Sequence, residues 1–183
     1  MHLIEPVLLL FIYSIFGEEN GMQELRNHIL NILYGGLWHT THPERFKHIL
    51  VSGAILPEPG IPESERWKTE RGKEYYPYVR SLGGVSLFDF DYFEPASYSE
   101  EYPLCSWREF VPFRKCWDAV IWIEIDRECV SSNLISASDL LEQWKSDKAY
   151  KHTIMPRIEA AHRGPLSQIA FKRIFLVRKG VSG

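Results

Sequence analysis

The sequence has few cysteines, no long apolar run and no excess of basic residues. Its three cysteines, Cys105, Cys116 and Cys129, are widely spaced and form no CxxC motif. Neither a disulfide framework nor a structural zinc site is therefore expected, and a reducing compartment suits the chain. The longest apolar run, residues 7–16, is shorter than the roughly 20 residues that a membrane-spanning helix needs.

The charge balance and the start of the chain give expectations about the cellular location and the partners of the protein. No Lys or Arg precedes the apolar run, whereas a secretory signal carries positive charge there. We therefore expect a cytoplasmic protein with no membrane partner. The 21 Lys and Arg residues are outnumbered by 24 Asp and Glu, which gives a formal net charge of −3. The chain lacks the basic excess of a general nucleic-acid binder, so any nucleic-acid contact would be a local patch.

The composition predicts one globular domain. With 183 residues, 45% of them hydrophobic and 14% aromatic, the chain has enough apolar material for a single core. Helical patterning begins cleanly just after Met22. Residues 1–21 are therefore either an apolar packing helix or an extension ahead of a start at Met22, and residues 22–183 form the domain.

Helix and strand signals are interleaved along the chain. Apolar spacing predicts a helix over residues 23–33, and a short strand then leads to His39. Thr41 and Glu44 form a capping box for a second helix, which Gly53 ends. The remaining expected elements are a long loop at 57–73, strands at 85–90, 119–125 and 169–177, and a Ser-capped helix at 138–144. Short strands and few crossover helices favour an α+β fold with a mixed or antiparallel sheet and flanking helices.

Three segments carry side chains that could perform chemistry. The first places His39 and Thr40 at a strand end. The second follows a glycine pair, where Ser86 and Phe88 alternate on one strand face. The third sets Glu159 in an apolar context beside basic residues, where its pKa could be tuned. Each segment also has an ordinary structural explanation as a cap, a core strand or an exposed charge.

Taken together, these segments resemble the ADP-ribosyltransferase fold superfamily. The closest similarity is to the branch that contains DNA-targeting ADP-ribosyltransferase toxins and tRNA 2′-phosphotransferases. The matching residues, in chain order, are HTT at 39–41, FKHIL at 46–50, GAILP at 53–57, Glu159, GPL at 164–166 and Ile169. The resemblance spans roughly residues 37–177 and implies a split sheet with flanking helices.

The resemblance implies that NAD is the substrate and that no metal is needed. Glu159 would accept a hydrogen bond from the ribose 2′-OH and stabilise positive charge on the sugar. His39 and Thr40 would position the ribose and the nicotinamide amide, and Arg80 would meet the pyrophosphate. Phe88, or a tyrosine within residues 75–78, would stack on the nicotinamide.

Ser86 and Phe88 are the candidates for the family's middle motif, which faces the nicotinamide ribose. The resemblance also implies a toxin-like transferase with a macromolecular acceptor. We favour nucleic acid slightly over protein, because basic residues are frequent near Glu159 in the sequence. These basic residues are Arg157, Arg163, Lys172, Arg173, Arg178 and Lys179. Plain NAD hydrolysis and 2′-phosphate transfer stay open.

Several alternatives remain at the level of sequence. A protein on the same fold could bind NAD or ADP-ribose without turnover. A metal-dependent nuclease could use two carboxylate pairs, each spaced i, i+2 on a strand: Asp89 and Asp91, and Glu124 and Asp126. A cysteine hydrolase would pair Cys105 or Cys116 with His162. The aromatic stretch at 92–117 is either a satellite core or a surface for stacking on bases.

Overall fold

The structure, a computed structural model, describes residues 12–15, 19–114 and 116–179. The helices are α1 (Glu19–Leu33), α2 (Pro43–Ser52), α3 (Tyr78–Ser81), α4 (Pro95–Glu101), α5 (Arg127–Val130) and α6 (Ala137–Ser146). The strands are β1 (Ile12–Ile15), β2 (Leu37–Thr41), β3 (Ala54–Ile55), β4 (Gly84–Asp89), β5 (Ala119–Ile125), β6 (Leu134–Ile135), β7 (Glu159–Arg163), β8 (Leu166–Ser167) and β9 (Phe171–Lys179). Short 3₁₀ turns lie at Glu63–Glu65, Lys73–Tyr75, Ser106–Glu109 and Gln168–Ala170.

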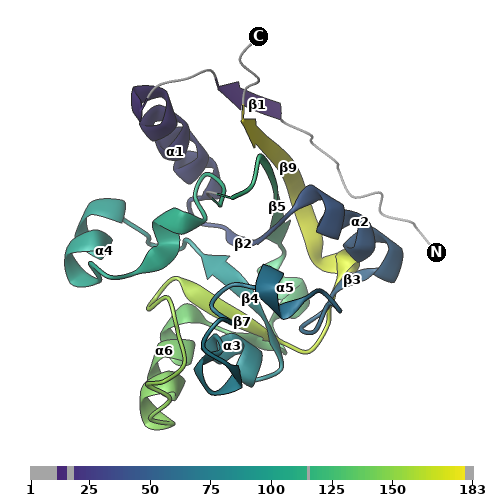
Figure 1. The fold of residues 1–183 in the computed structure, drawn as a ribbon, viewed down its shortest axis with the longest axis vertical. Coiled ribbons are helices and arrows are strands. Elements are labelled where there is room, and N and C mark those ends of the chain that lie inside the picture. Colours follow the sequence, from purple (N-terminus) through teal and green to yellow (C-terminus); the bar gives the residue numbers. More distant parts are fainter. Residues whose placement is uncertain (1–11, 16–18, 115, 180–183) are drawn as a thin grey trace.

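A mostly antiparallel sheet forms the centre of the molecule (Figure 1). Its seven strands run in the order β1-β9-β5-β2-β4-β7-β6, and β3 pairs with β8 in a separate two-stranded ribbon. Only the β1–β9 pair is parallel among the described strands. The expected α+β class and the mostly antiparallel sheet are therefore confirmed.

Side chains cover both faces of the sheet. Along β5, Val120 and Trp122 join one core cluster, whereas Ile121 and Ile123 join another on the opposite face. This alternation follows from the period of two along a strand. Helix α1 packs against the first cluster, and α2 and α5 pack against the second. The continuous apolar run in β5 reflects burial on both sides.

The structure corrects two expected helix caps. Thr41 is not the cap of α2, because it stays in β2 and pairs with Ile121 of β5. The cap is His42, whose ring Nδ1 accepts a hydrogen bond from the Glu44 N–H at 3.2 Å. Helix α6 begins after Ser136 and so starts one residue before Ser138, the first residue that the sequence pattern predicted. The exit of α2 through Gly53, at φ 73°, is confirmed.

At the start of the chain, the part that the structure describes is a strand and not the packing helix that was one of the two alternatives. Ile12–Ile15 forms the edge strand β1 beside β9, and α1 already begins at Glu19. The rest of the apolar run, residues 7–11 and 16, lies outside the described residues. The last strand also begins later than predicted, because residues 168–170 form a 3₁₀ turn. Within the described ranges, no helix is both long and apolar enough to cross a membrane.

Candidate active site

The sheet opens between two of its central strands. The β2–β4 ladder is limited to two rungs, Leu37↔Asp89 and Trp38↔Phe88. Beyond these rungs β2 continues along β5, while β4 continues along β7. The diverging strands leave a cavity of about 470 Å³, which α2, β3 and the loop before α3 close on the other sides.

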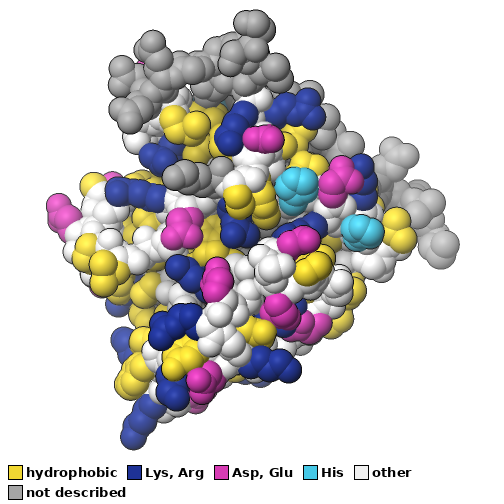
Figure 2. All heavy atoms as spheres, in the orientation of Figure 1, with side chains coloured by type: hydrophobic (Ala, Val, Ile, Leu, Met, Phe, Trp, Pro, Cys, Tyr) yellow, Lys and Arg dark blue, Asp and Glu magenta, His cyan; other side chains and the backbone are white. Residues whose placement is uncertain are grey.

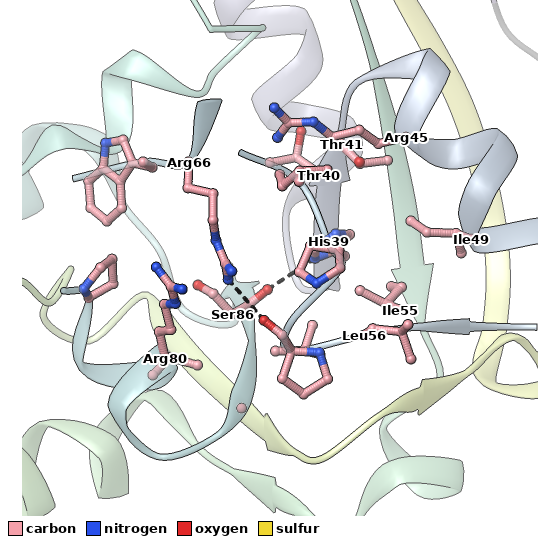
Figure 3. Close-up of a pocket in the computed structure, with 18 of the residues that line it drawn as sticks. His39, Thr40, Thr41, Arg45, Ile49, Ile55, Leu56, Arg66, Arg80 and Ser86 are labelled. Carbon is pink, nitrogen blue, oxygen red and sulfur yellow. Dashed lines mark hydrogen bonds between the residues drawn. The ribbon is translucent and has the colours of Figure 1, made fainter. Parts of the chain in front are cut away.

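The cavity brings together six of the site residues that the sequence predicted, but its lining includes none of the tyrosines at 75, 76 and 78. Its lining includes His39, Thr40, Arg80, Ser86, Phe88 and Glu159. Figure 3 shows His39 beside Ser86, with Arg80 on the other side of Ser86 in this view. These residues come from four separate segments of the chain, so only the tertiary fold assembles them. Their roles toward a ligand stay predictions.

Glu159 lies at the base of the cavity and is only 1% exposed. Its carboxylate accepts a hydrogen bond from the Ser86 hydroxyl at 2.7 Å and another from the Met155 backbone N–H at 2.9 Å. Burial raises the pKa of Glu159 to about 7, although both hydrogen bonds act in the opposite direction. The group therefore changes charge near neutral pH, as catalytic carboxylates often do.

His39 is held by the backbone of the neighbouring strand. Its ring Nδ1 lies 3.1 Å from the Ser86 carbonyl oxygen, which only accepts hydrogen bonds. Burial lowers the pKa of His39 to about 4, so the ring is neutral at physiological pH. Nδ1 must then carry the proton, and Nε2 is left as a hydrogen-bond acceptor.

Thr40 and Phe88 complete the inner wall. The Thr40 hydroxyl is buried and lacks a hydrogen-bond partner among the described atoms. Such a group is costly to bury unless a ligand or water satisfies it. Phe88 is 4% exposed and stacks on Phe90, with ring centroids 5.6 Å apart. Its ring therefore belongs mainly to the core, and it is not free to stack on a ligand.

Arg80 lines the cavity, but its guanidinium already has partners. It bonds the carboxylates of Glu58 and Glu63, both in the loop before α3. Arg66, from the same loop, also bonds Glu58. Sequence reasoning missed Arg66 because the mixed-charge run at 63–74 has no period that shows which side chains turn inward.

Another part of the cavity is aromatic and basic, and it was also missed. Two guanidinium groups lie near the Trp117 ring, that of Arg45 at 5.6 Å and that of Arg114 at 5.1 Å from its centroid. The ring of His42 meets the Trp117 ring edge to face, at 5.4 Å between centroids. The high aromatic content of residues 92–117 was the available signal, but it could not separate Trp117 from its core neighbours.

Most of that aromatic stretch is core. Phe93, Tyr98, Trp107, Phe110 and Phe113 all belong to the same buried cluster as Trp38 and Trp122. These rings are therefore core residues, as one of the two alternatives expected, but they belong to the main core and not to a satellite cluster. Trp117 differs because it is only partly buried and lines the cavity.

The basic residues near Glu159 in the sequence do not gather around it in space. Strand β9, which carries most of them, is separated from β7 by β5, β2 and β4. Lys172 and Arg173 pair with Glu124, and Lys179 pairs with Asp118. Figure 2 shows basic and acidic side chains intermixed over the visible face. The four basic residues of β9 therefore do not contribute to a surface around Glu159.

The carboxylates of the nuclease alternative have separate structural roles. Asp89 pairs with Arg127, Glu124 pairs with Arg173, and Asp126 caps α5. Within the described part of the chain, no three His, Cys, Asp or Glu side chains form a group that could hold a metal ion. The four carboxylates thus offer no assembled cation site.

The cysteine alternative gains no support either. Burial raises the pKa of the Cys105 thiol, which makes it a poorer nucleophile at neutral pH. His162, its suggested partner, is buried in β7, where its Nδ1 lies 3.2 Å from the Gly164 carbonyl oxygen.

Comparison with family models, with curated proteins and with solved structures gives no match for this chain. The geometry of the cavity is therefore the basis for proposing a function.

Proposed function

We propose that the protein is an NAD-dependent ADP-ribosyltransferase that cleaves the bond between nicotinamide and ribose. The observation that carries this proposal is Glu159, a buried carboxylate at the base of a nucleotide-sized cavity, held by Ser86 and flanked by His39. A buried carboxylate stabilises positive charge far better than one in water.

The chemistry parallels glycoside cleavage. As the nicotinamide leaves, positive charge grows on the ribose, and the Glu159 carboxylate stabilises that charge. The same carboxylate accepts a hydrogen bond from the 2′-OH, which strengthens in the transition state. The His39 Nε2 supplies a second acceptor for a ribose hydroxyl, and the unpaired Thr40 hydroxyl supplies a hydrogen bond for the nicotinamide amide. After departure of nicotinamide, the acceptor forms a bond to the sugar carbon from the open face and gives up its proton to the Glu159 carboxylate.

The direct test is release of nicotinamide from NAD by the purified protein. It is measured alone and then with single-stranded DNA, with RNA and with a protein mixture. Release in any arm supports the proposal, and the arm that raises the rate identifies the acceptor class. NAD binding without release would favour the non-catalytic alternative on the same fold. Absence of NAD binding would refute both.

The rate should depend on pH through Glu159. Because its pKa is about 7, the carboxylate is protonated and uncharged below that value. We therefore expect nicotinamide release to rise as pH increases from 5 to 8 and to level off above 8. The Ser86 hydroxyl lowers this pKa, so Ser86→Ala should move the acid limb of the profile to higher pH. A flat profile in the wild type would contradict the role of Glu159.

We propose single-stranded nucleic acid as the acceptor. The support is Trp117, a partly buried ring that lines the cavity close to the guanidinium groups of Arg45 and Arg114. Nucleic-acid single strands bind by stacking bases on aromatic rings and by placing phosphates near cations. A local patch of this kind agrees with the net charge of −3, which argues against a broad basic surface.

Trp117→Ala should lower transfer to single-stranded nucleic acid by roughly tenfold, the loss expected from one base–aromatic contact. Nicotinamide release without an acceptor should fall less than transfer does, because the roles proposed at the ribose belong to Glu159 and His39 and not to Trp117. Tyr34→Ala, which removes a ring that is 63% exposed at the end of α1, is the matched control. Equal transfer by both variants would remove the argument for a nucleic-acid acceptor.

A further inference from the structure

The cavity arginines are bound by acids from a loop of the same chain. Arg80 donates to Glu58 at 2.8 and 3.1 Å and to Glu63 at 2.6 and 2.7 Å. Arg66 donates to Glu58 as well, and to the Pro57 carbonyl oxygen at 2.9 Å. The ring of Tyr76 lies 4.0 Å from the Arg80 guanidinium and helps to fix its plane. Four charged groups thus form one neutral network.

The arginines and the acids differ sharply in exposure. The side chains of Arg66 and Arg80 are 13% and 14% exposed, whereas those of Glu58 and Glu63 are 61% and 50% exposed. If the network opened, water could solvate the two acids at once, but the two arginines would stay in the cavity wall. The arginines therefore need an anionic partner at this place, whereas water alone can solvate the two acids.

The geometry of the network suits one kind of anion. A guanidinium binds a phosphate in the same two-pronged manner as a carboxylate, so a phosphate can take over the hydrogen bonds that Glu58 and Glu63 now make. A diphosphate linking two nucleosides carries two negative charges, the same charge as the two carboxylates. Arg66 and Arg80 both line the cavity that holds His39, Ser86 and Glu159 (Figure 3).

We propose that Glu58 and Glu63 hold Arg66 and Arg80 in the free protein, and that a bound diphosphate, which Arg80 is already expected to meet, takes the place of both acids on the two guanidinium groups. A bound diphosphate displaces both acids and frees the loop segment from Pro57 to Glu63. The end of the segment stays attached, because Arg45 donates to the Glu65 carbonyl oxygen at 3.0 Å. The inference rests on the proposed function for the identity of the nucleotide, but the exchange of carboxylate for phosphate can be tested without turnover.

The test compares ADP and adenosine binding by calorimetry. The double variant Glu58→Gln/Glu63→Gln keeps the size of both side chains and removes their charge. We expect it to bind ADP about tenfold more tightly than the wild type, as loss of two competing ion pairs allows. Adenosine, which has no phosphate, should bind both proteins equally. Glu44→Gln, an exposed acid paired with Lys47 on α2, should leave ADP binding unchanged.

Other results would overturn the proposal. ADP binding that is equal or weaker in the double variant would show that the acids do not compete with phosphate. Absence of ADP binding in both proteins, or a gain in adenosine affinity equal to that for ADP, would refute the subsite. If the double variant fails to fold, the single variant Glu63→Gln replaces it, because that side chain is half exposed.

Hydrogen exchange in the wild type gives a second measurement. ADP should speed amide exchange in residues 57–63 if the acids leave the arginines, and slower exchange there would contradict displacement. These measurements distinguish failure of the subsite from failure of the proposed function. Tighter ADP binding by the double variant with no nicotinamide release from NAD would leave the subsite standing and refute the transferase. Nicotinamide release from NAD, without tighter ADP binding by the double variant, would support the transferase and refute the subsite.

Discussion

Replacing Glu159 with glutamine should lower the rate of nicotinamide release at least about a hundredfold, the scale of losing one electrostatic contact to a transition state. The amide keeps the size of the carboxylate. Its oxygen can accept from the Met155 N–H, and its NH₂ can donate to the Ser86 hydroxyl, so both hydrogen bonds of the site are preserved. The negative charge alone is lost. A rate close to that of the wild type would refute the catalytic role.

The stability of the same variant serves as its control. The folded-state pKa of Glu159 is raised from 4.5 to about 7, so the buried group favours its neutral form. The wild type therefore loses stability as pH rises from about 4.5 through 7, where the buried carboxyl must ionise. Glutamine does not ionise. Thermal melts should show a variant that is about as stable as the wild type at pH 4.5 and more stable at pH 8.

This pairing of lower activity with higher stability separates two explanations. A misfolded variant would lose activity and melt at a lower temperature at every pH. A variant that lacks only the charge should melt higher at pH 8, because the cost of burying an ionised carboxylate has been removed. Lower stability at pH 8 would mean that Glu159 serves the fold rather than the reaction.

Local parts of the fold followed from the sequence because the signals that specify them are local. Gly53 ends α2 in the left-handed conformation, and Pro43 begins it, as their backbone preferences predict. The strand over Ala119–Ile125 was predicted with its observed bounds, since an apolar run rich in β-branched residues indicates a buried strand. The cap of α2 was misplaced because Thr41 can either cap the helix or pair in β2, and pairing with Ile121 prevails.

The site was predictable as a set of residues but not as a geometry. His39, Ser86 and Glu159 were identified through their resemblance to a family pattern, and the cavity does bring them together. The place where β2 and β4 separate could not be predicted, because it depends on strand order. The partners of Arg80 were missed for a related reason. Glu58 and Glu63 lie 22 and 17 residues away in a loop, where no periodicity indicates which charges meet.

Gly36→Ala should destabilise the fold by about 3 kcal/mol, the upper end of what overpacking a buried core costs. A Cβ at Gly36 would overlap Nε1 of the Trp38 indole and lie 2.8 Å from its Cε2. The indole has no free space to move into. It is fully buried, donates to the Leu33 carbonyl at 2.8 Å and meets the Phe175 ring edge to face at 5.4 Å.

Urea denaturation of Gly36→Ala beside Gly35→Ala measures this effect. Gly35 has nothing within 4 Å of its would-be Cβ, but its φ is 73°, so alanine there should cost only about 1 kcal/mol of backbone strain. Equal losses of unfolding free energy in the two variants would show that the Trp38 indole can move aside at little cost. A larger loss at Gly36 would have a consequence for the site. Trp38 and Phe88 form the last rung before β2 and β4 diverge, and the next residue is His39. The indole that fixes this rung therefore also fixes where the cavity begins.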